Sequence, residues 1–317
     1  AAATRVAPAF GFDSVDICIL STSENVVCAV NNADGSRAVV RFHRAGYNTI
    51  DELNSEVVWV AALAADGVPV PSARPTKDGG FYIPIDIAGE TRYVGAVDWV
   101  PGSPLSDQVS IGSRSLTDHY ARIGEIAAQI RRHNTRWVPP PSFTRRRWDA
   151  DGFMGPAPLW GRFWEVDSLS ASQRRLFADA RTALRSELAE LSTGPDRFGL
   201  IHSDLHLGNL MADGDRLTVI DFDDSGFGWF GYELAVALHS VLATPQEDPA
   251  RAAMVQGYRS VHTLDHEEER TIDTFLTVRA LMGVGWQDAR PELPSFATIQ
   301  ERISAAVGQI ERYFSSS

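Results

Sequence analysis

Alternating and β-branched hydrophobic positions dominate the first hundred residues. The pattern predicts four strands, at Val26 to Val30, Ala38 to Phe42, Phe81 to Ile87 and Arg92 to Trp99. The first two flank the turn Asn31 to Gly35 and predict a β-hairpin, while Asp78-Gly79-Gly80 predicts a turn before the third. This region is therefore expected to form a small sheet.

One helix is predicted within the same region. Thr49 and Glu52 have the spacing of a capping box, and Gly67 is expected to end the helix. The apolar residues between them recur at helical spacing and predict one buried face: Leu53, Val57, Val60, Ala61 and Ala64.

The period of the hydrophobic pattern changes after the dense turn signal Pro101 to Pro104. Helical spacing begins with Leu116, Tyr120, Ile123, Ala127 and Ile130, returns from Ser172 to Leu191, and continues from Tyr232 to Phe314 with breaks around Pro245 and from Pro291 to Pro294. Short strands are predicted near Ile201 and Val219, and residues 137–161 are expected to form an ordered loop. The sequence therefore predicts an α+β fold with two domains, 1–99 and 100–317.

Composition and charge limit the classes of partner that the protein is expected to bind. The 317 residues are 44% hydrophobic and 22% charged, which is typical of a globular protein. A formal net charge of −12 argues against a nucleic-acid partner and favours a cationic or neutral one.

Cysteine usage and hydropathy predict the compartment. The only cysteines, Cys18 and Cys28, lie in apolar stretches and are expected in the core, which indicates a reducing compartment rather than a disulfide framework. The sequence shows neither a signal peptide nor a membrane span, so we expect a cytoplasmic protein with no membrane partner. Its oligomeric state is left open.

Chemistry concentrates in two neighbouring segments. Asp204 is followed five residues later by Asn209, and a hairpin turning at Asp213-Gly214-Asp215 is predicted to bring Asp221 back beside them. Phosphoryl transfer needs a carboxylate that accepts the proton of an attacking hydroxyl, and oxygen ligands for a hard cation. The three side chains supply that set.

These segments resemble a known family. His202-Ser-Asp204-Leu-His-Leu-Gly-Asn209 and Ile220-Asp221-Phe-Asp223 are similar to the catalytic loop and the metal-binding segment of the protein-kinase-like small-molecule phosphotransferases, a group that includes aminoglycoside phosphotransferases, choline kinases and type II homoserine kinases. The resemblance implies a two-lobed fold, with a nucleotide-binding lobe at 1–99 and a catalytic lobe at 100–317. It also implies ATP and Mg²⁺ as cofactors, Asp204 as catalytic base, and Asn209, Asp221 and Asp223 as metal ligands.

The resemblance also implies nucleotide contacts in the first lobe. Arg41 stands where such kinases carry a phosphate-binding lysine, and Glu56 is expected to be its buried partner. The turn Leu20 to Asn25 has no glycine, so Ser23 is expected to cover the phosphates. Asp98 and Val100 are expected to bind adenine through their main-chain groups.

Several alternatives remain open at this stage. The acceptor hydroxyl is expected on an antibiotic, such as an aminoglycoside or another sugar-containing compound, or on an amino-alcohol metabolite such as homoserine. A serine/threonine protein kinase and a nucleotide-binding pseudokinase are weighed as rivals. The alternation of His202, Asp204 and His206 also fits a metal-dependent hydrolase. The run Arg145 to Arg147 is expected to be solvated.

Overall fold

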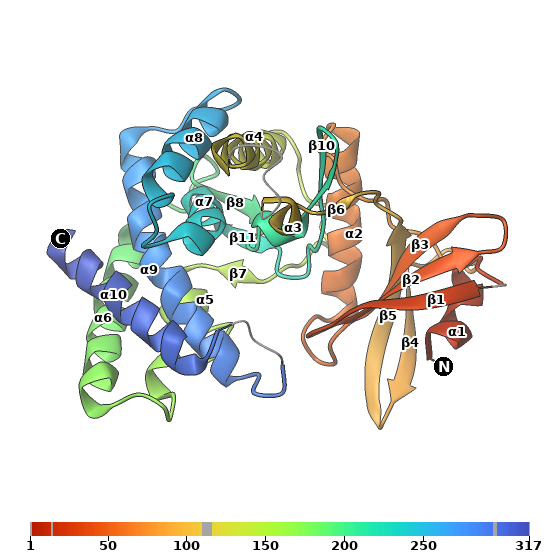
Figure 1. The fold of residues 1–317 in the computed structure, drawn as a ribbon, viewed down its shortest axis with the longest axis horizontal. Coiled ribbons are helices and arrows are strands. Elements are labelled where there is room, and N and C mark those ends of the chain that lie inside the picture. The colour runs from red at the N-terminus through yellow and green to blue at the C-terminus, as the bar shows by residue number, and fades with distance from the viewer. Residues whose placement is uncertain (1, 14, 110–115, 294–296, 317) are drawn as a thin grey trace. The chain divides into compact units, whose positions relative to one another are not determined.

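The structure is a computed structural model that describes residues 2–13, 15–109, 116–293 and 297–316 (Figure 1). The chain forms two compact units, each assembled from three separate segments. The first unit contains residues 1–105, 137–145 and 208–223, and the second contains residues 106–136, 146–207 and 224–317. The domain boundary at residue 99 stays a prediction.

A five-stranded antiparallel sheet dominates the first unit. Its strands are β1 (Val15–Thr22), β2 (Val26–Asn32), β3 (Arg37–Phe42), β4 (Tyr82–Ile87) and β5 (Glu90–Asp98), in the order β1-β2-β3-β5-β4. Val26 pairs with Phe42, which confirms the predicted hairpin. The short elements α1 (Ala2–Val6) and η1 (Ala7–Phe10) contribute apolar side chains to the core against the sheet.

The first strand of the sheet is the apolar stretch that contains Cys18, and its position at the edge changes the expectation for the cysteines. β1 is an edge strand, and its residues Ile19 and Leu20 are 63% and 49% exposed. Cys28 on β2 is buried, but Cys18 on β1 is exposed. The prediction that both cysteines lie in the core is therefore wrong for Cys18, because an edge strand leaves part of its surface uncovered.

Helix α2 (Ile50–Ala65) begins at the predicted capping box. The hydroxyl of Thr49 accepts from the main-chain N–H of Glu52, and the Glu52 carboxylate accepts from the main-chain N–H of Thr49. The predicted buried face of α2 is wrong for Ala61 and Ala64, whereas Val57 and Val60 are half-buried. Trp59 and Leu63 are fully buried while Ala61 and Ala64 are exposed, because a helix that is apolar almost all round buries its largest side chains.

A second sheet of the first unit carries the predicted hairpin of the motif region. It consists of β6 (Ser103–Pro104), β9 (Leu210–Asp213) and β10 (Arg216–Val219), in the order β10-β9-β6. Gly102 has a φ of +96°, and a Cβ there would lie 2.1 Å from the carbonyl oxygen of Ala212. Only glycine permits so close an approach of the two chain segments.

The second unit is mainly helical, as predicted. Its helices are α3 (Leu105–Val109), α4 (Leu116–Asn134), α5 (Ala150–Met154), η2 (Phe163–Glu165), α6 (Ala171–Glu190), α7 (Phe230–Leu238), η4 (His239–Val241), α8 (Glu247–Arg259), α9 (His266–Asp288) and α10 (Ile299–Ser316). A small sheet has the order β7 (Arg147–Trp148), β11 (Gly226–Trp229), β8 (Phe198–Ile201). The loop predicted at 137–161 carries β7 and α5, and part of the break from Pro291 to Pro294 lies outside the described residues.

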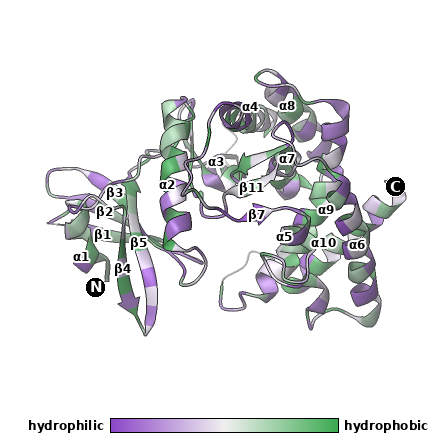
Figure 2. Cartoon of the chain, turned by 180° about the vertical axis from the view of Figure 1, so that it is seen from behind, coloured by the Kyte–Doolittle hydropathy of each residue, from purple (hydrophilic) through white to green (hydrophobic). Residues whose placement is uncertain are grey.

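Close packing and aromatic side chains hold this unit together. A Cβ on Gly257 of α8 would lie 1.9 Å from the carbonyl oxygen of Ala121 on α4, so the two helices touch through their main chains. Phe153 and Tyr232 pack with ring centroids 4.6 Å apart. The helices α6 and α10 carry both hydrophobic and hydrophilic residues, as expected where one face packs and the other meets solvent (Figure 2). No helix in the described part of the chain is long and apolar enough to cross a bilayer.

Candidate active site

The loop that precedes Asp204 is anchored by Glu233 in the second unit. Glu233 lies on α7, is 3% exposed, and accepts the main-chain N–H groups of His202 at 2.7 Å and Ser203 at 2.8 Å. Ser203 has a φ of 67°, in the left-handed region that non-glycine residues rarely adopt. The carboxylate of Glu233 therefore fixes a strained main-chain conformation next to the predicted base. Its position in the apolar stretch from Phe230 to Leu238 was the sequence signal for a buried role, which was overlooked.

Burial makes the protonation of Glu233 sensitive to pH. Burial raises the pKa of Glu233 to about 7, against the opposing effect of the two N–H donors from His202 and Ser203. The folded protein thus binds this proton more tightly than the unfolded chain does between about pH 4.5 and 7. The resulting stabilisation is complete below pH 4.5 and is lost as the pH rises through 7.

A Glu233→Gln variant tests this linkage. From pH 4.5 to 7.5, the free energy of unfolding of the wild type should fall, relative to that of Glu233→Gln, by on the order of 3 kcal/mol. Urea unfolding at both pH values measures the difference. Exposed Glu90, replaced by Gln, serves as the control and should follow the wild type. Parallel pH profiles for wild type and Glu233→Gln would show that Glu233 does not titrate in this range.

Asp204 itself is held between two basic side chains. Arg279 Nη2 lies 2.6 Å from Oδ1 of Asp204, and His206 Nε2 lies 3.3 Å from Oδ2. Burial alone would raise the pKa of Asp204, but His206 and Arg279 lower it well below its usual range. Asp204 is therefore an ionised carboxylate at neutral pH, as a general base must be. Arg279 was not identified from the sequence.

The two histidines of the loop have structural contacts. Nδ1 of His202 accepts the main-chain N–H of Asp204 at 3.3 Å, and His206 pairs with the Asp204 carboxylate. The hydrolase alternative requires a cluster of metal ligands. Among the described residues, no three or more His, Cys, Asp or Glu side chains are grouped so that they could hold a metal ion.

Asn209 and Asp221 lie at the open end of the β9–β10 hairpin in the first unit. The main-chain N–H of Ile220 donates to the carbonyl oxygen of Asn209 at 3.0 Å, so the residues that precede and follow the two strands are adjacent. Asp221 has a φ of 67°, and its carboxylate pairs with Arg41 Nη1 at 2.9 Å. The hairpin thus brings together the two segments that the sequence predicted to meet.

Arg41 contacts both acids of the Asp221 segment. Its Nη1 lies 3.4 Å from Oδ1 of Asp223, in addition to the contact with Asp221. Burial alone would lower the pKa of Arg41, but the carboxylates of Asp221, Asp223 and Glu56 raise it above its usual value. Arg41 is therefore a fixed positive charge beside the predicted metal ligands.

Asp223 is enclosed more fully than Asp221. His43 Nδ1 lies 3.1 Å from its Oδ1, and the side-chain amide of Asn25 donates to its Oδ2. Burial alone would raise the pKa of Asp223, but His43 and Arg41 lower it well below its usual range. Its side chain is 9% exposed, whereas that of Asp221 is 37% exposed. These surroundings favour a structural role for Asp223, and its role as a metal ligand stays a prediction.

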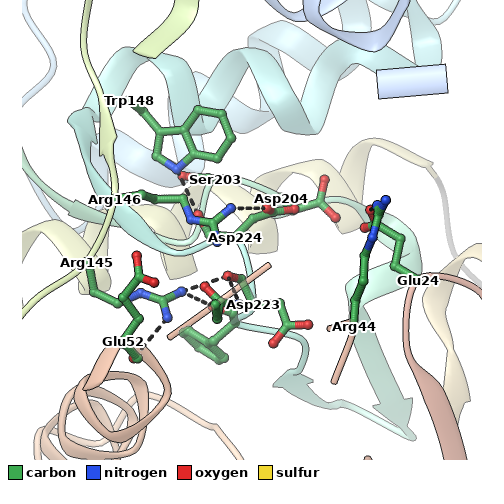
Figure 3. A network of polar contacts seen from close by, with 12 residues as sticks. Glu24, Arg44, Glu52, Arg145, Arg146, Trp148, Ser203, Asp204, Asp223 and Asp224 are labelled. Atoms are coloured by element: carbon green, nitrogen blue, oxygen red, sulfur yellow. Dashed lines mark hydrogen bonds and ion pairs between the residues drawn. The ribbon is translucent and has the colours of Figure 1, made fainter. Parts of the chain in front are cut away.

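The partner of Glu56 differs from the expected one. Arg145 Nη1, not Arg41, lies within ion-pair distance of Glu56, at 3.5 Å. The Arg145 guanidinium also donates to the main-chain oxygens of Glu52, Phe222 and Asp223 (Figure 3). It thereby holds the segment that follows Asp221.

The run Arg145 to Arg147 is consequently not a solvated surface throughout. The side chain of Arg145 is fully buried, and that of Arg146 is 6% exposed and pairs with Asp224 at 3.2 Å (Figure 3). Only Arg147 is mainly exposed. The expectation failed because a run of charges does not reveal which of its members meet distant carboxylates.

The predicted nucleotide contacts in the first unit are placed as follows. Ser23 is exposed in the β1–β2 turn, and its main-chain N–H already donates to the carbonyl oxygen of Asn25. The main-chain N–H of Asp98 donates to Ser72, and its carboxylate pairs with Arg74 at 2.7 Å. The main-chain groups of Val100 make no hydrogen bond within the described residues. The main-chain N–H groups of Ser23 and Asp98 are therefore already used, whereas the main-chain groups of Val100 are available to a purine.

The donor set of the first unit fits a hard divalent cation. Asp221 offers a partly exposed carboxylate, and Asn209 offers an amide oxygen on the adjacent segment. Mg²⁺ prefers oxygen ligands of this kind and retains several waters or phosphate oxygens in kinase sites. The residues present are thus suited to the ion, with Arg41 providing a further positive charge.

The chain has a unit built on a five-stranded antiparallel sheet and a second, mainly helical unit. These are the parts of a protein-kinase-like fold. The profile of the phosphotransferase enzyme family matches residues 18–271, and the chain belongs to this family. It is a small-molecule kinase.

Individual relatives agree with this assignment. A microcompartment-associated aminopropanol kinase of known structure is 32% identical, with a TM-score of 0.86 over 99% of this chain and 97% of that chain. Amicoumacin kinase of Bacillus subtilis (strain 168) is 24% identical over 89% of this chain and 82% of its own length. The fold is also that of an amicoumacin kinase solved with AMP-PNP and Ca²⁺, which has 20% identity, a TM-score of 0.76, and coverage of 94% and 88% of the two chains.

Proposed function

We propose that this chain transfers the γ-phosphoryl group of ATP to a hydroxyl of a small molecule, with Asp204 as the base. The O–H bond of the acceptor breaks, its proton passes to the Asp204 carboxylate, and the acceptor oxygen forms a bond to the γ-phosphorus. The bond from that phosphorus to the bridging oxygen breaks at the same time and ADP leaves. No covalent intermediate on the protein is needed.

Residues of the first unit would bind the metal ion, the phosphates and the adenine. Asn209 and Asp221 would hold Mg²⁺, which supplies charge neutralisation to the phosphoryl oxygens when bound. Arg41 binds the phosphates, and Val100 offers main-chain groups to adenine. The observation that carries the proposal is the state of Asp204, a partly buried and ionised carboxylate on a loop fixed by Glu233. An ionised carboxylate next to the acceptor hydroxyl can orient that hydroxyl and take its proton as the phosphoryl group is transferred.

The acceptor is a small alcohol, either a metabolite or an antibiotic. The relatives include an aminopropanol kinase, amicoumacin kinases and, at 25% identity over 74% of this chain and 68% of its own length, a homoserine kinase of Methylobacillus glycogenes. We therefore place amino alcohols and hydroxy amino acids first among candidate acceptors, and hydroxyl-bearing antibiotics second.

A coupled assay of ADP release tests the proposal. The purified chain is supplied with ATP or GTP, with and without Mg²⁺, over a panel of amino alcohols, hydroxy amino acids and antibiotics. We expect Mg²⁺-dependent ADP release with at least one acceptor, and labelled phosphate on that acceptor. Tight ATP binding without transfer to any acceptor would support the pseudokinase instead. Label on polypeptide would support a protein kinase.

The phosphate contact of Arg41 gives a separate prediction. An Arg41→Ala variant should raise the Kd of ATP by about 10- to 100-fold, because a charge-assisted hydrogen bond contributes about 1.5–3 kcal/mol. Arg41→Lys retains the charge and should recover part of the affinity. The variants are compared by calorimetric titration with a non-hydrolysable ATP analogue. An unchanged Kd for Arg41→Ala would remove Arg41 from the phosphate site.

A further inference from the structure

Arg279 occupies one oxygen of the base before any acceptor is bound. Its Nη2 donates to Oδ1 of Asp204 at 2.6 Å. Its Nη1 makes longer contacts of 3.5 Å with the carbonyl oxygen of Ser203 and with the hydroxyl of Tyr232. The guanidinium carbon lies 4.5 Å from the ring centroid of Trp160, which fixes its plane. With His206 on Oδ2, both oxygens of Asp204 already face basic groups before an acceptor hydroxyl arrives.

A second arginine of the same unit has no acidic partner. Arg302 on α10 is half-buried, and its Nε is a buried atom without a hydrogen-bond partner among the described residues. Burial and the neighbouring Arg279 both lower the pKa of Arg302. Its nearest surroundings are Trp286, whose ring centroid is 5.9 Å from the guanidinium carbon, and Gly283, where a Cβ would meet its Nη1 at 3.4 Å. Gly283 follows Arg279 by one helical turn of α9, so it lies on the same face of that helix.

The other polar groups nearby do not neutralise Arg302. Burial lowers the pKa of His239 to about 3, and Arg279, Arg302 and His206 add to this effect, so the ring is neutral. Its Nδ1 is also buried without a hydrogen-bond partner in the described residues. The residues outside the described ranges, 1, 14, 110–115, 294–296 and 317, carry no acidic side chain. A chain with a net charge of −12 thus leaves one half-buried cation, a neighbour of Arg279, uncompensated.

An uncompensated, partly buried cation is unfavourable unless a ligand supplies the anion. We propose that Arg302 and Arg279 bind a carboxylate carried by the acceptor alcohol. This inference rests on the proposed function and narrows its acceptor to a hydroxy acid. The acceptor carboxylate takes Arg279 as its bidentate partner and leaves Oδ1 of Asp204 free for the acceptor hydroxyl. Binding of the correct acceptor therefore releases the base.

Matched acceptors test the proposal. L-Threonine and 1-aminopropan-2-ol differ only in the carboxylate, as do L-homoserine and 3-aminopropan-1-ol. Calorimetric titration in the presence of Mg²⁺ and a non-hydrolysable ATP analogue gives the Kd of each compound. In at least one pair, the carboxylate-bearing member should bind at least tenfold more tightly. Equal affinity within both pairs, or no binding by any of the four, overturns the proposal.

Variants of α10 assign the preference to Arg302. Arg302→Gln should reduce the difference within the pair, because only Arg279 then remains to bind the carboxylate, and Arg302→Lys should restore part of it. Arg312→Gln is the matched control, because Arg312 lies on the same helix but pairs with Glu247 at the surface. It should keep the wild-type preference. An undiminished preference in Arg302→Gln overturns the assignment, and circular dichroism of each variant verifies folding.

ADP release separates this inference from the proposed function. Mg²⁺-dependent transfer to an amino alcohol but not to its carboxylate-bearing counterpart would overturn the carboxylate site and leave the kinase function intact. Arg302-dependent binding of a hydroxy acid without phosphoryl transfer from ATP would support the carboxylate site and contradict the kinase function.

Discussion

Replacement of Asp204 by Asn is expected to lower kcat by a factor of about 10²–10⁴, the usual contribution of a positioned general base. The amide has the shape of the carboxylate and can still accept a hydrogen bond from Arg279, whose Nη2 lies 2.6 Å from Oδ1 in the wild type. It cannot take the proton of the acceptor hydroxyl. The Kd of ATP should stay near the wild-type value, because the nucleotide contacts belong to other residues.

A control distinguishes the loss of a base from the loss of an ion pair. Asp273 on α9 pairs with Arg251 at 2.6 Å at the surface, and Asp273→Asn removes an ion pair without touching the loop of Asp204. This variant should retain wild-type turnover. Turnover at wild-type rates by Asp204→Asn would mean that Asp204 is not the base.

Replacement of Asp221 by Asn is expected to lower turnover by about 10³-fold, comparable to the loss of a strong electrostatic contact with the transition state. The amide is a weaker ligand for Mg²⁺, so the nucleotide should no longer bind more tightly when Mg²⁺ is added. Titrations of the ATP analogue with and without the ion measure this effect directly.

Asp223→Asn gives the matched comparison for the neighbouring acid. Its carboxylate is enclosed by His43, Arg41 and Asn25, so this change should mainly lower the free energy of unfolding. The opposite result would be that Mg²⁺ strengthens nucleotide binding in Asp221→Asn but not in Asp223→Asn. That result would make Asp223 the metal ligand and Asp221 the structural carboxylate.

The parts of the site that the sequence predicted are those set by local structure. The turn Asp213-Gly214-Asp215 and its flanking β-branched residues predict the hairpin that brings Asn209 next to the Asp221 segment. The capping box of α2 was likewise visible as a spacing of three residues. Both depend on contacts between residues close together in the chain.

The parts that the sequence did not predict depend on distant contacts. Arg279 lies 75 residues from Asp204, on a helix that is buried almost all round from Thr274 to Gly285. The ion-pair partner of Glu56 is Arg145, which lies on the connecting segment before β7, and not Arg41 of strand β3. The hydrogen bonds of Glu233 to His202 and Ser203 require the fold of the loop that it holds, so its place in an apolar stretch did not identify its partners. Residue type alone could not identify these partners.

The proposed phosphoryl transfer requires a metal ion bound by Asn209 and Asp221, in addition to the base Asp204. Crystals of the chain grown with Mn²⁺ and a non-hydrolysable ATP analogue would locate the ion by its anomalous scattering. We predict one peak at about 2.1 Å from Oδ1 of Asn209 and from a carboxylate oxygen of Asp221. An ion bound to the nucleotide with neither residue as a ligand would contradict the account.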